Sequence, residues 1–162
     1  MLPLDELVRT LALEPHPEGG FYRETYRSSV IVDTPRGPRP ASTAIHFLVP
    51  GDTFSALHRI ASDEVWHHHA GAPLRVVQLD EHGARIDHLL GTDLARGQRP
   101  QAVVPAGAWF GAHVEDDGAW SLVGCTVAPG FDFADFELGD RDALLARFPQ
   151  HAELVRRLTR EG

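Results

Sequence analysis

The pattern of hydrophobic positions changes twice along the chain. Apolar residues of 4–11 recur at helical spacing, which predicts a short amphipathic helix. From residue 21 onward, short runs of apolar and β-branched residues replace this spacing, with turns rich in Gly, Pro and Asp at roughly 8–12-residue intervals. After Asp140, a good N-cap, helical spacing returns and predicts helices over about 141–158. The pattern is typical of an antiparallel sandwich or barrel with a short helix or helices at each end.

The β-rich part contains nine candidate strands, and the proline-rich segment 35–40 is expected to be a loop. The strands are expected at 21–32, 43–49, 53–59, 64–69, 74–79, 84–90, 101–104, 108–113 and 120–127. No repeat, low-complexity tail or linker-like break interrupts them. We therefore expect one domain over 1–162, with the β-barrel over about 21–136.

Composition narrows the classes of partner and chemistry. A formal net charge of −8 argues against nucleic acid and anionic membrane surfaces, because both require a basic protein face. The chain has no lysine, which excludes Schiff-base and lysine general-base chemistry. Its single cysteine, Cys125, excludes an intramolecular disulfide and a cysteine-based zinc site, and its apolar neighbours predict a buried small hydrophobe. No apolar run reaches the ~18 residues of a membrane span, and the N-terminus lacks secretory-signal features, so a cytoplasmic location is expected.

In the middle of the chain, Gly51, His58, Glu64 and Gly71 follow a spacing that resembles the first motif of the cupin superfamily. That motif places Gly, His-x-His, Glu and Gly at fixed intervals. Here Gly51, His58, Glu64 and Gly71 stand at matching intervals, and Ile60 occupies the position of the second histidine. Two residues apart on a strand, positions 58 and 60 face the same side of the sheet.

The second cupin motif is also recognisable in part. Pro105 and Gly107 match its Pro-x-Gly, but Phe110 stands where cupins have a histidine. Four further segments are His16-Pro-Glu-Gly-Gly20, Ser55-x-x-His58-Arg59, Ser62-Asp-Glu-Val-Trp66 and Val127-Ala-Pro-Gly-Phe131. They resemble the hallmarks of a small cupin branch of unknown function (cupin-5, or DUF985-like), and this closer likeness covers nearly the whole chain. It implies an all-β, double-stranded β-helix (jelly-roll) barrel with short terminal helices and a homodimer, without implying a reaction.

The favoured hypothesis for the site is a metal-free centre. An imidazole and a carboxylate within hydrogen-bond reach form an acid/base pair, so His58 and Glu64 are the candidate catalytic residues. Metal-free cupins that epimerise deoxysugar nucleotides use an interior histidine as base, and this chain resembles that scheme in part. This second likeness, unlike the cupin-5 one, implies an isomerase- or epimerase-like activity on a sugar-like or acidic metabolite. An alternative is a non-catalytic storage or sensing cupin, in which this pair only holds two strands together.

A metal-dependent oxygenase or isomerase is the second alternative. Catalytic transition metals usually take three or four protein ligands, and only His58 and Glu64 remain at matching positions. A divalent transition metal would therefore need a substitute ligand such as His68 or His46. Without one, two ligands would bind the ion weakly.

Other residues near the motifs are expected to contact a small-molecule ligand, because aromatic walls around a few polar groups are typical of such pockets. Trp66 and His68 are an even number of positions from Glu64 on one strand, so they face the same side of the sheet as Glu64 (the same parity). Ser55 is three positions from His58 and so faces the opposite side, unless the strand bulges. His67 and His69 are expected to face outward, and Glu18 to be a cap or dimer contact in a rigid turn. The expected ligand-binding residues are Trp66, His68, Trp109, Phe110, Ser55 and His46.

Overall fold

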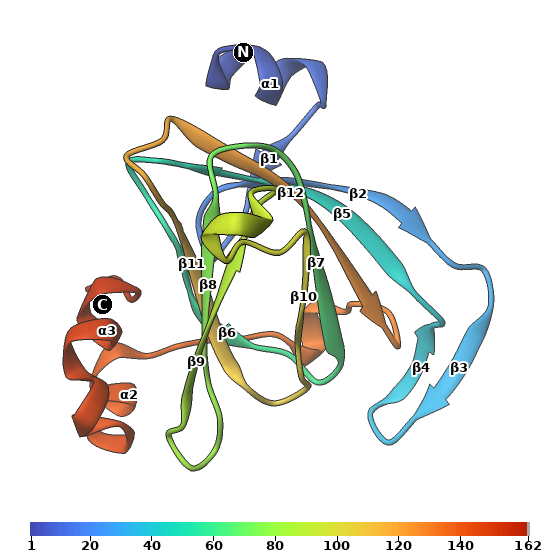
Figure 1. The fold of residues 1–162 in the computed structure, drawn as a ribbon. Coiled ribbons are helices and arrows are strands. Elements are labelled where there is room, and N and C mark those ends of the chain that lie inside the picture. The colour runs from blue at the N-terminus through green and yellow to red at the C-terminus, as the bar shows by residue number, and fades with distance from the viewer. Residues whose placement is uncertain (162) are drawn as a thin grey trace.

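Two antiparallel sheets face each other and enclose the core, as Figure 1 shows. The computed structural model describes residues 1–161. The larger sheet has the strand order β1-β2-β5-β12-β7-β10 and the smaller one β13-β6-β11-β8-β9. Neighbours along the sequence often lie in different sheets, as in a jelly roll. The predicted all-β fold with short terminal helices is therefore confirmed.

The larger sheet consists of β1 (Glu14–Pro15), β2 (Phe21–Arg27), β5 (Thr43–Pro50), β7 (Asp63–Gly71), β10 (Gln101–Val104) and β12 (Trp120–Ala128). The smaller sheet consists of β6 (Ser55–Arg59), β8 (Leu74–Leu79), β9 (Arg85–Leu90), β11 (Trp109–Val114) and β13 (Glu137–Leu138). The α-helices are α1 (Leu4–Thr10), α2 (Arg141–Arg147) and α3 (Ala152–Arg157), and short 3-10 helices span Leu94–Arg96, Phe133–Asp135 and Pro149–His151.

The segment expected to be one strand over 21–32 followed by a loop over 35–40 differs from that prediction. β2 ends at Arg27, and the chain then forms the hairpin of β3 (Ile31–Thr34) and β4 (Gly37–Pro40), which projects from the body at the right of Figure 1. Proline cannot donate to a β-ladder, but an edge strand tolerates it. The prolines of β4 are therefore compatible with this two-stranded ribbon. They are also the reason that the sequence predicted a loop here.

Three apolar clusters stabilise these layers. The first fills the space between the sheets and includes Phe47, Trp66 and Phe110. The second lies on the outer face of the smaller sheet, where α2 and α3 cover Leu57, Val77 and Trp109. The third fixes α1 at the barrel end through residues that include Leu7, Leu48 and Trp120.

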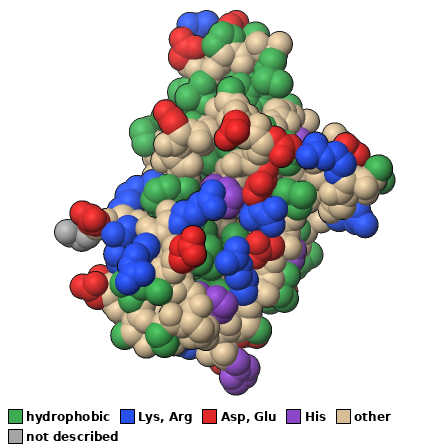
Figure 2. Space-filling view, turned by 60° about the vertical axis from the view of Figure 1, so that its left-hand side comes forward, with side chains coloured by type: hydrophobic (Ala, Val, Ile, Leu, Met, Phe, Trp, Pro, Cys, Tyr) green, Lys and Arg blue, Asp and Glu red, His purple; other side chains and the backbone are tan. Residues whose placement is uncertain are grey.

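The uncovered part of the smaller sheet is a mixed charged surface. Figure 2 shows arginine and acidic side chains interspersed on this side of the molecule. Arg75 pairs with Asp87 at 3.2 Å and with Glu115, and Arg85 pairs with Asp87 at 2.8 Å. Among the described residues, no helix has the length and apolar character that crossing a bilayer requires.

The turn before β2 depends on glycine, and substitution there is expected to destabilise the protein. Gly20 has a φ of +77°, and an added Cβ would lie 2.7 Å from the Leu48 carbonyl oxygen. We expect Gly20→Ala to lower the free energy of unfolding by about 3 kcal/mol, from backbone strain plus this clash. Gly107→Ala is the control, because Gly107 has a φ of +83° but open space around it, and should cost only about 1 kcal/mol. Equal losses in urea unfolding would contradict the clash.

Candidate functional site

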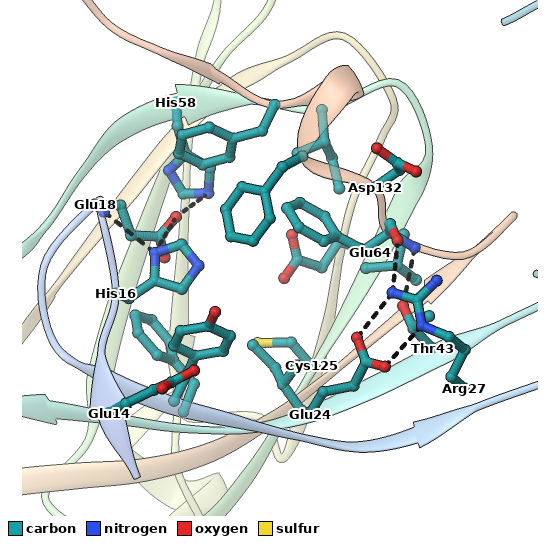
Figure 3. A pocket seen from close by; sticks show the side chains of 18 residues that line it. Glu14, His16, Glu18, Glu24, Arg27, Thr43, His58, Glu64, Cys125 and Asp132 are labelled. Carbon is teal, nitrogen blue, oxygen red and sulfur yellow. Dashed lines mark hydrogen bonds and ion pairs between the residues drawn. The ribbon is translucent and has the colours of Figure 1, made fainter. Parts of the chain in front are cut away.

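A cavity of about 340 Å³ opens between the two sheets, at the low end of the range for small-molecule sites. Its walls come from β2, β5, β6, β7 and β12, from the segment before β2, and from the segment around residues 131–136. Figure 3 shows polar side chains around the cavity, with His16, Glu18 and His58 on one side and Glu64 and Asp132 on another. A polar site therefore lies inside an otherwise apolar barrel.

His58 and Glu18 form a buried ion pair on one wall. His58 on β6 is 3% exposed and Glu18 is 5% exposed, and His58 Nε2 lies 2.8 Å from Glu18 Oε2. Ser55 donates its hydroxyl to the other oxygen, Oε1, at 2.9 Å. The sequence-based hypothesis paired His58 with Glu64, and the structure corrects it: Glu18 is the hydrogen-bond partner of His58. Glu18 is thus a residue of the cavity wall rather than only a turn or dimer contact.

Both ring nitrogens of His58 act as donors. Nδ1 lies 2.7 Å from the Ala56 carbonyl oxygen, which can only accept, and Nε2 faces a carboxylate. Burial alone would lower the pKa of His58, but the Glu18 carboxylate, with smaller contributions from Glu64 and the Ala56 carbonyl, raises it above its usual value. Burial alone would likewise raise the pKa of Glu18, yet His58 lowers it. These contacts favour the protonated imidazolium, in which neither ring nitrogen has a free lone pair.

His16 presents a hydrogen-bond donor to the cavity. Its Nδ1 accepts the backbone N–H of Glu18 at 3.1 Å, so the proton of the neutral ring is on Nε2, which points into the cavity in Figure 3. Burial and the positive charge of His58 lower the pKa of His16, although Glu18 opposes them. At neutral pH this imidazole is neutral and offers one N–H.

Glu64 on β7 is a buried carboxyl without a cationic partner. It is 8% exposed and lines the cavity, and among residues 1–161 no ion pair includes it. Burial, together with the nearby Glu18 carboxylate, raises the pKa of Glu64 to about 7, although His58 opposes this shift and the Cys125 thiol donates a weak hydrogen bond. Glu64 can therefore gain or lose a proton near neutral pH.

The residues present do not fit a catalytic metal. Ile60 and Phe110 occupy two of the cupin ligand positions, and both contribute apolar surface. Both nitrogens of His58 are engaged as donors. Among the described residues, no group of three or more His, Cys, Asp or Glu side chains is arranged to hold an ion. The hypothetical His58–Glu64 metal site, with His68 or His46 as a third ligand, is therefore not supported by this donor geometry.

A bulge in β6 explains how Ser55 and His58 both reach Glu18. Phe110 of β11 pairs with His58, and Ala112 pairs with Ser55, so three steps on β6 match two on β11. This extra residue reverses the parity that separates the two side chains in a regular strand. Phe110 lies beside His58, with ring centroids 4.0 Å apart.

None of the six expected ligand contacts lines the cavity. Ser55 and Phe110 contact the lining residues Glu18 and His58, and the other four lie elsewhere. Trp66 faces inward but is packed in the core against Phe47 and Phe110. His68 also has inward parity, yet it lies further along β7, where its Nε2 is 3.0 Å from the Ala72 carbonyl oxygen. Trp109 has the opposite parity to Phe110 and packs under α2 and α3, with Arg59 above its ring.

His46 is the fourth, and it lies on the outer face of the larger sheet. It pairs in register with Gly124, and its ring centroid is 6.4 Å from that of His69. Ile45 and Phe47, its neighbours on β5, face the cavity instead. His67 and His69 also lie on the outer face, as their parity predicts; His67 contacts Thr126 Oγ1 at 3.0 Å.

The sequence-based hypothesis missed the segment that carries His16 and Glu18. The Glu18 carbonyl accepts the Ala56 N–H at 2.7 Å and the Arg160 guanidinium at 2.9 Å, which anchors the segment against β6. Positive φ angles at Gly19 and Gly20 close the turn that aims both side chains inward. The Pro-Glu-Gly-Gly sequence indicates a rigid turn, but nothing local indicates which strand it will contact.

The raised pKa of Glu64 predicts a pH-dependent effect on stability. For a carboxyl whose folded pKa lies above its unfolded value of 4.5, the folded state is destabilised as the pH rises from that value through about 7. Glu64→Gln should therefore raise the free energy of unfolding by about 3 kcal/mol at pH 8 and have little effect near pH 4. Urea unfolding at both pH values measures this. A pH-independent effect would contradict it.

Comparisons with known proteins agree with the architecture. The family model "Cupin superfamily (DUF985)", named Cupin_5, matches residues 5–139. A crystal structure of a protein from Shewanella oneidensis is 44% identical, with a TM-score of 0.93 and complete coverage of both chains. A hypothetical protein from Leishmania major is 37% identical, covers 99% of this chain and 100% of its own, and has a TM-score of 0.94.

More distant structures share only the fold. Oxalate decarboxylase from Bacillus subtilis is 17% identical with a TM-score of 0.56, over 90% of this chain and 36% of that enzyme. No curated protein matches the sequence. The match of the family model over most of the chain shows that this protein belongs to the Cupin_5 (DUF985) family of the cupin superfamily.

Proposed function

We propose that this cupin binds a small polar metabolite in the barrel and catalyses a proton transfer on it without a metal, as isomerases and epimerases do. The observation that carries the proposal is the arrangement of the cavity. A buried carboxyl without a cationic partner, Glu64, and an imidazole N–H, that of His16, line the same 340 Å³ space. A proton acceptor and a neutral hydrogen-bond donor are the two groups that enolisation next to a carbonyl needs.

Each residue has a distinct role in this proposal. The Glu64 carboxylate takes the proton from the carbon next to the ligand carbonyl, and the electron pair of that C–H bond moves toward the carbonyl oxygen. His16 Nε2–H donates to this oxygen as negative charge develops there. Glu64 then returns the proton, on the same face, to the former carbonyl carbon. The hydroxyl proton of the neighbouring carbon moves to the former carbonyl oxygen as the new carbonyl forms, which gives the isomer; the epimer requires the intermediate to turn its opposite face toward Glu64 first.

His58 and Glu18 are positioning residues in this scheme. The protonated imidazole is fully engaged with the Glu18 carboxylate and the Ala56 carbonyl, so it has no lone pair to act as base. Through the Glu18 backbone N–H, the same segment fixes the tautomer of His16. The catalytic centre proposed from the sequence thus moves from His58 and Glu64 to His16 and Glu64.

Solvent deuterium exchange tests the proposal across a range of candidate substrates. The purified full-length protein is incubated in D₂O with a panel of aldoses, ketoses and amino sugars, and NMR follows the hydrogen next to the carbonyl. We expect at least one compound to lose this signal faster with protein than without it. Binding of panel members without any exchange would contradict catalysis and support a ligand-binding or sensing role.

A further inference from the structure

The charged groups around the cavity leave negative charge unbalanced. Five carboxyl groups line it, from Glu14, Glu18, Glu24, Glu64 and Asp132. The two cations of the lining, His58 and Arg27, are each engaged by one of these carboxylates. The balance of the remaining groups determines which ligand charge the site favours.

The charge of Arg27 is already balanced by a carboxylate. Its Nε and one terminal nitrogen donate to the two oxygens of Glu24 at 2.8 and 2.9 Å, and the terminal nitrogen also donates to the Phe131 carbonyl at 3.2 Å. Figure 3 shows this fork at the edge of the cavity. A bidentate pair of this kind neutralises both charges, and the second terminal nitrogen of Arg27 has no hydrogen bond within residues 1–161.

Three carboxyl groups of the lining form no ion pair within residues 1–161, namely Glu14, Asp132 and Glu64. Hydrogen bonds to other carboxylates raise the pKa of the Arg27 and Arg39 guanidinium groups, and Asp132 is near enough to add to both effects. Asp132 accepts the Ala134 N–H at 2.8 Å through one oxygen, which leaves the other available. Burial and the carboxylates of Glu14 and Glu24 raise the pKa of Tyr22, which agrees with a negative potential in this part of the cavity. An anionic ligand would be repelled there, and a cation attracted.

An aromatic wall adjoins Asp132, which lies between Phe131 and Phe133 in the chain. Phe131, Phe133 and Phe136 contact one another, with centroid separations between 4.9 and 6.3 Å. Phe133 is 50% exposed, although the other two are partly buried. Ring faces attract cations, and a few aromatic rings beside carboxylates are a common way to bind an ammonium group.

We propose that the ligand of this cavity carries a positively charged amino group, which the Phe131–Phe133–Phe136 wall and the carboxylate of Asp132 receive. The inference deepens the proposed function, because the rest of the ligand occupies the space between His16 and Glu64. It replaces the acidic metabolite expected from the family resemblance with an amine. A sugar-like body remains compatible with it.

A matched set of three probes tests the charge of the ligand. Benzylamine, benzyl alcohol and benzoate have similar size and one ring each, and differ in charge. Titration of the full-length protein at neutral pH, followed by calorimetry and by NMR shifts of cavity residues, gives the affinities. We expect benzylamine to bind at least about tenfold more tightly than benzyl alcohol, and benzoate more weakly than either. Equal affinities, a preference for benzoate, or no shift of cavity residues with benzylamine at millimolar concentration would overturn the inference.

Two variants assign the effect to the site. Asp132→Asn removes one charge but keeps an N-cap side chain for the Phe133–Asp135 turn, so folding should be unaffected. Asp132→Asn should lower the affinity for benzylamine about threefold and leave the affinity for benzyl alcohol unchanged. Glu81→Gln, on the exposed turn between β8 and β9, is the control and should change neither. An Asp132→Asn effect no larger than that of Glu81→Gln would contradict the proposed subsite.

The two proposals fail separately. Tight amine binding with no deuterium exchange would contradict the catalytic role and leave the ligand class intact. Exchange confined to neutral or anionic compounds would contradict the ligand class and leave the catalytic role intact.

Discussion

Glu18→Ala is expected to lower the free energy of unfolding by about 3–5 kcal/mol, because it leaves a buried imidazolium without its counter-charge. His58 is 3% exposed, and its Nε2 has no other partner than Glu18 among the described residues. Ser55, whose hydroxyl donates to the same carboxylate, would lose its acceptor as well. Urea unfolding of the full-length protein measures the loss.

The pH dependence of this loss identifies the ion pair. The stability contributed by His58, whose folded pKa is raised, is fully present below its unfolded value of 6.5 and is lost as the pH rises through the folded pKa. The stability contributed by Glu18, whose folded pKa is lowered, is present above its unfolded value of 4.5 and is lost as the pH falls through the folded pKa. The difference between wild type and Glu18→Ala should therefore be largest between about pH 4.5 and 6.5.

Ser55→Ala is the matched control for this prediction. It removes one hydrogen bond to Glu18 without removing a charge, and should cost about 1 kcal/mol. If Glu18→Ala were no more destabilising than Ser55→Ala, the pair would not be ionised in the folded protein.

Glu64→Gln is expected to reduce deuterium exchange of the substrate by about 10²–10⁴-fold, because the amide keeps the shape of the side chain but cannot accept the proton. The wild-type rate should rise up to tenfold per pH unit below the pKa of Glu64, about 7, and level off above it, since the carboxylate is the active form. NMR exchange rates across this pH range measure both effects.

Cys125→Ala is the control for the effect of Glu64→Gln on deuterium exchange. Cys125 lies on β12 beside Glu64 and lines the same cavity. Burial raises the pKa of its thiol well above the usual range, so it should not act as a nucleophile. Exchange that survives in Glu64→Gln but is lost in Cys125→Ala would contradict the assigned roles.

The sequence predicts the barrel and one half of the site. Alternation along β6 and β7 places His58 and Glu64 inside, because each side chain's direction follows from its own strand. Parity fails for Ser55, whose position depends on a bulge in the pairing of β6 with β11. Strand alternation also cannot tell whether an inward side chain lines a cavity or packs in the core. Trp66 faces inward, as predicted, but it packs in the core and does not line the cavity.

The other half of the site depends on contacts between distant segments. Glu18 reaches His58 across 40 positions of the chain, and Phe131 lies beside Arg27 because the segment after β12 returns over β2. Turn residues such as Gly19 and Gly20 indicate that the chain bends, but not what it bends toward. These residues could be found only from the assembled fold.

The anchoring of residues 14–20 onto β6 has a consequence for how this protein can be shortened or fused. Met1 is almost fully solvent-exposed, so an added tag or linker there would not meet the site. Removal of the first twenty residues would leave every strand from β2 onward, yet it would take away one N–H donor and one counter-ion of the cavity. A trimmed variant with native-like circular dichroism is therefore expected to lack the proposed activity, because His16 and Glu18 lie outside the strands that remain.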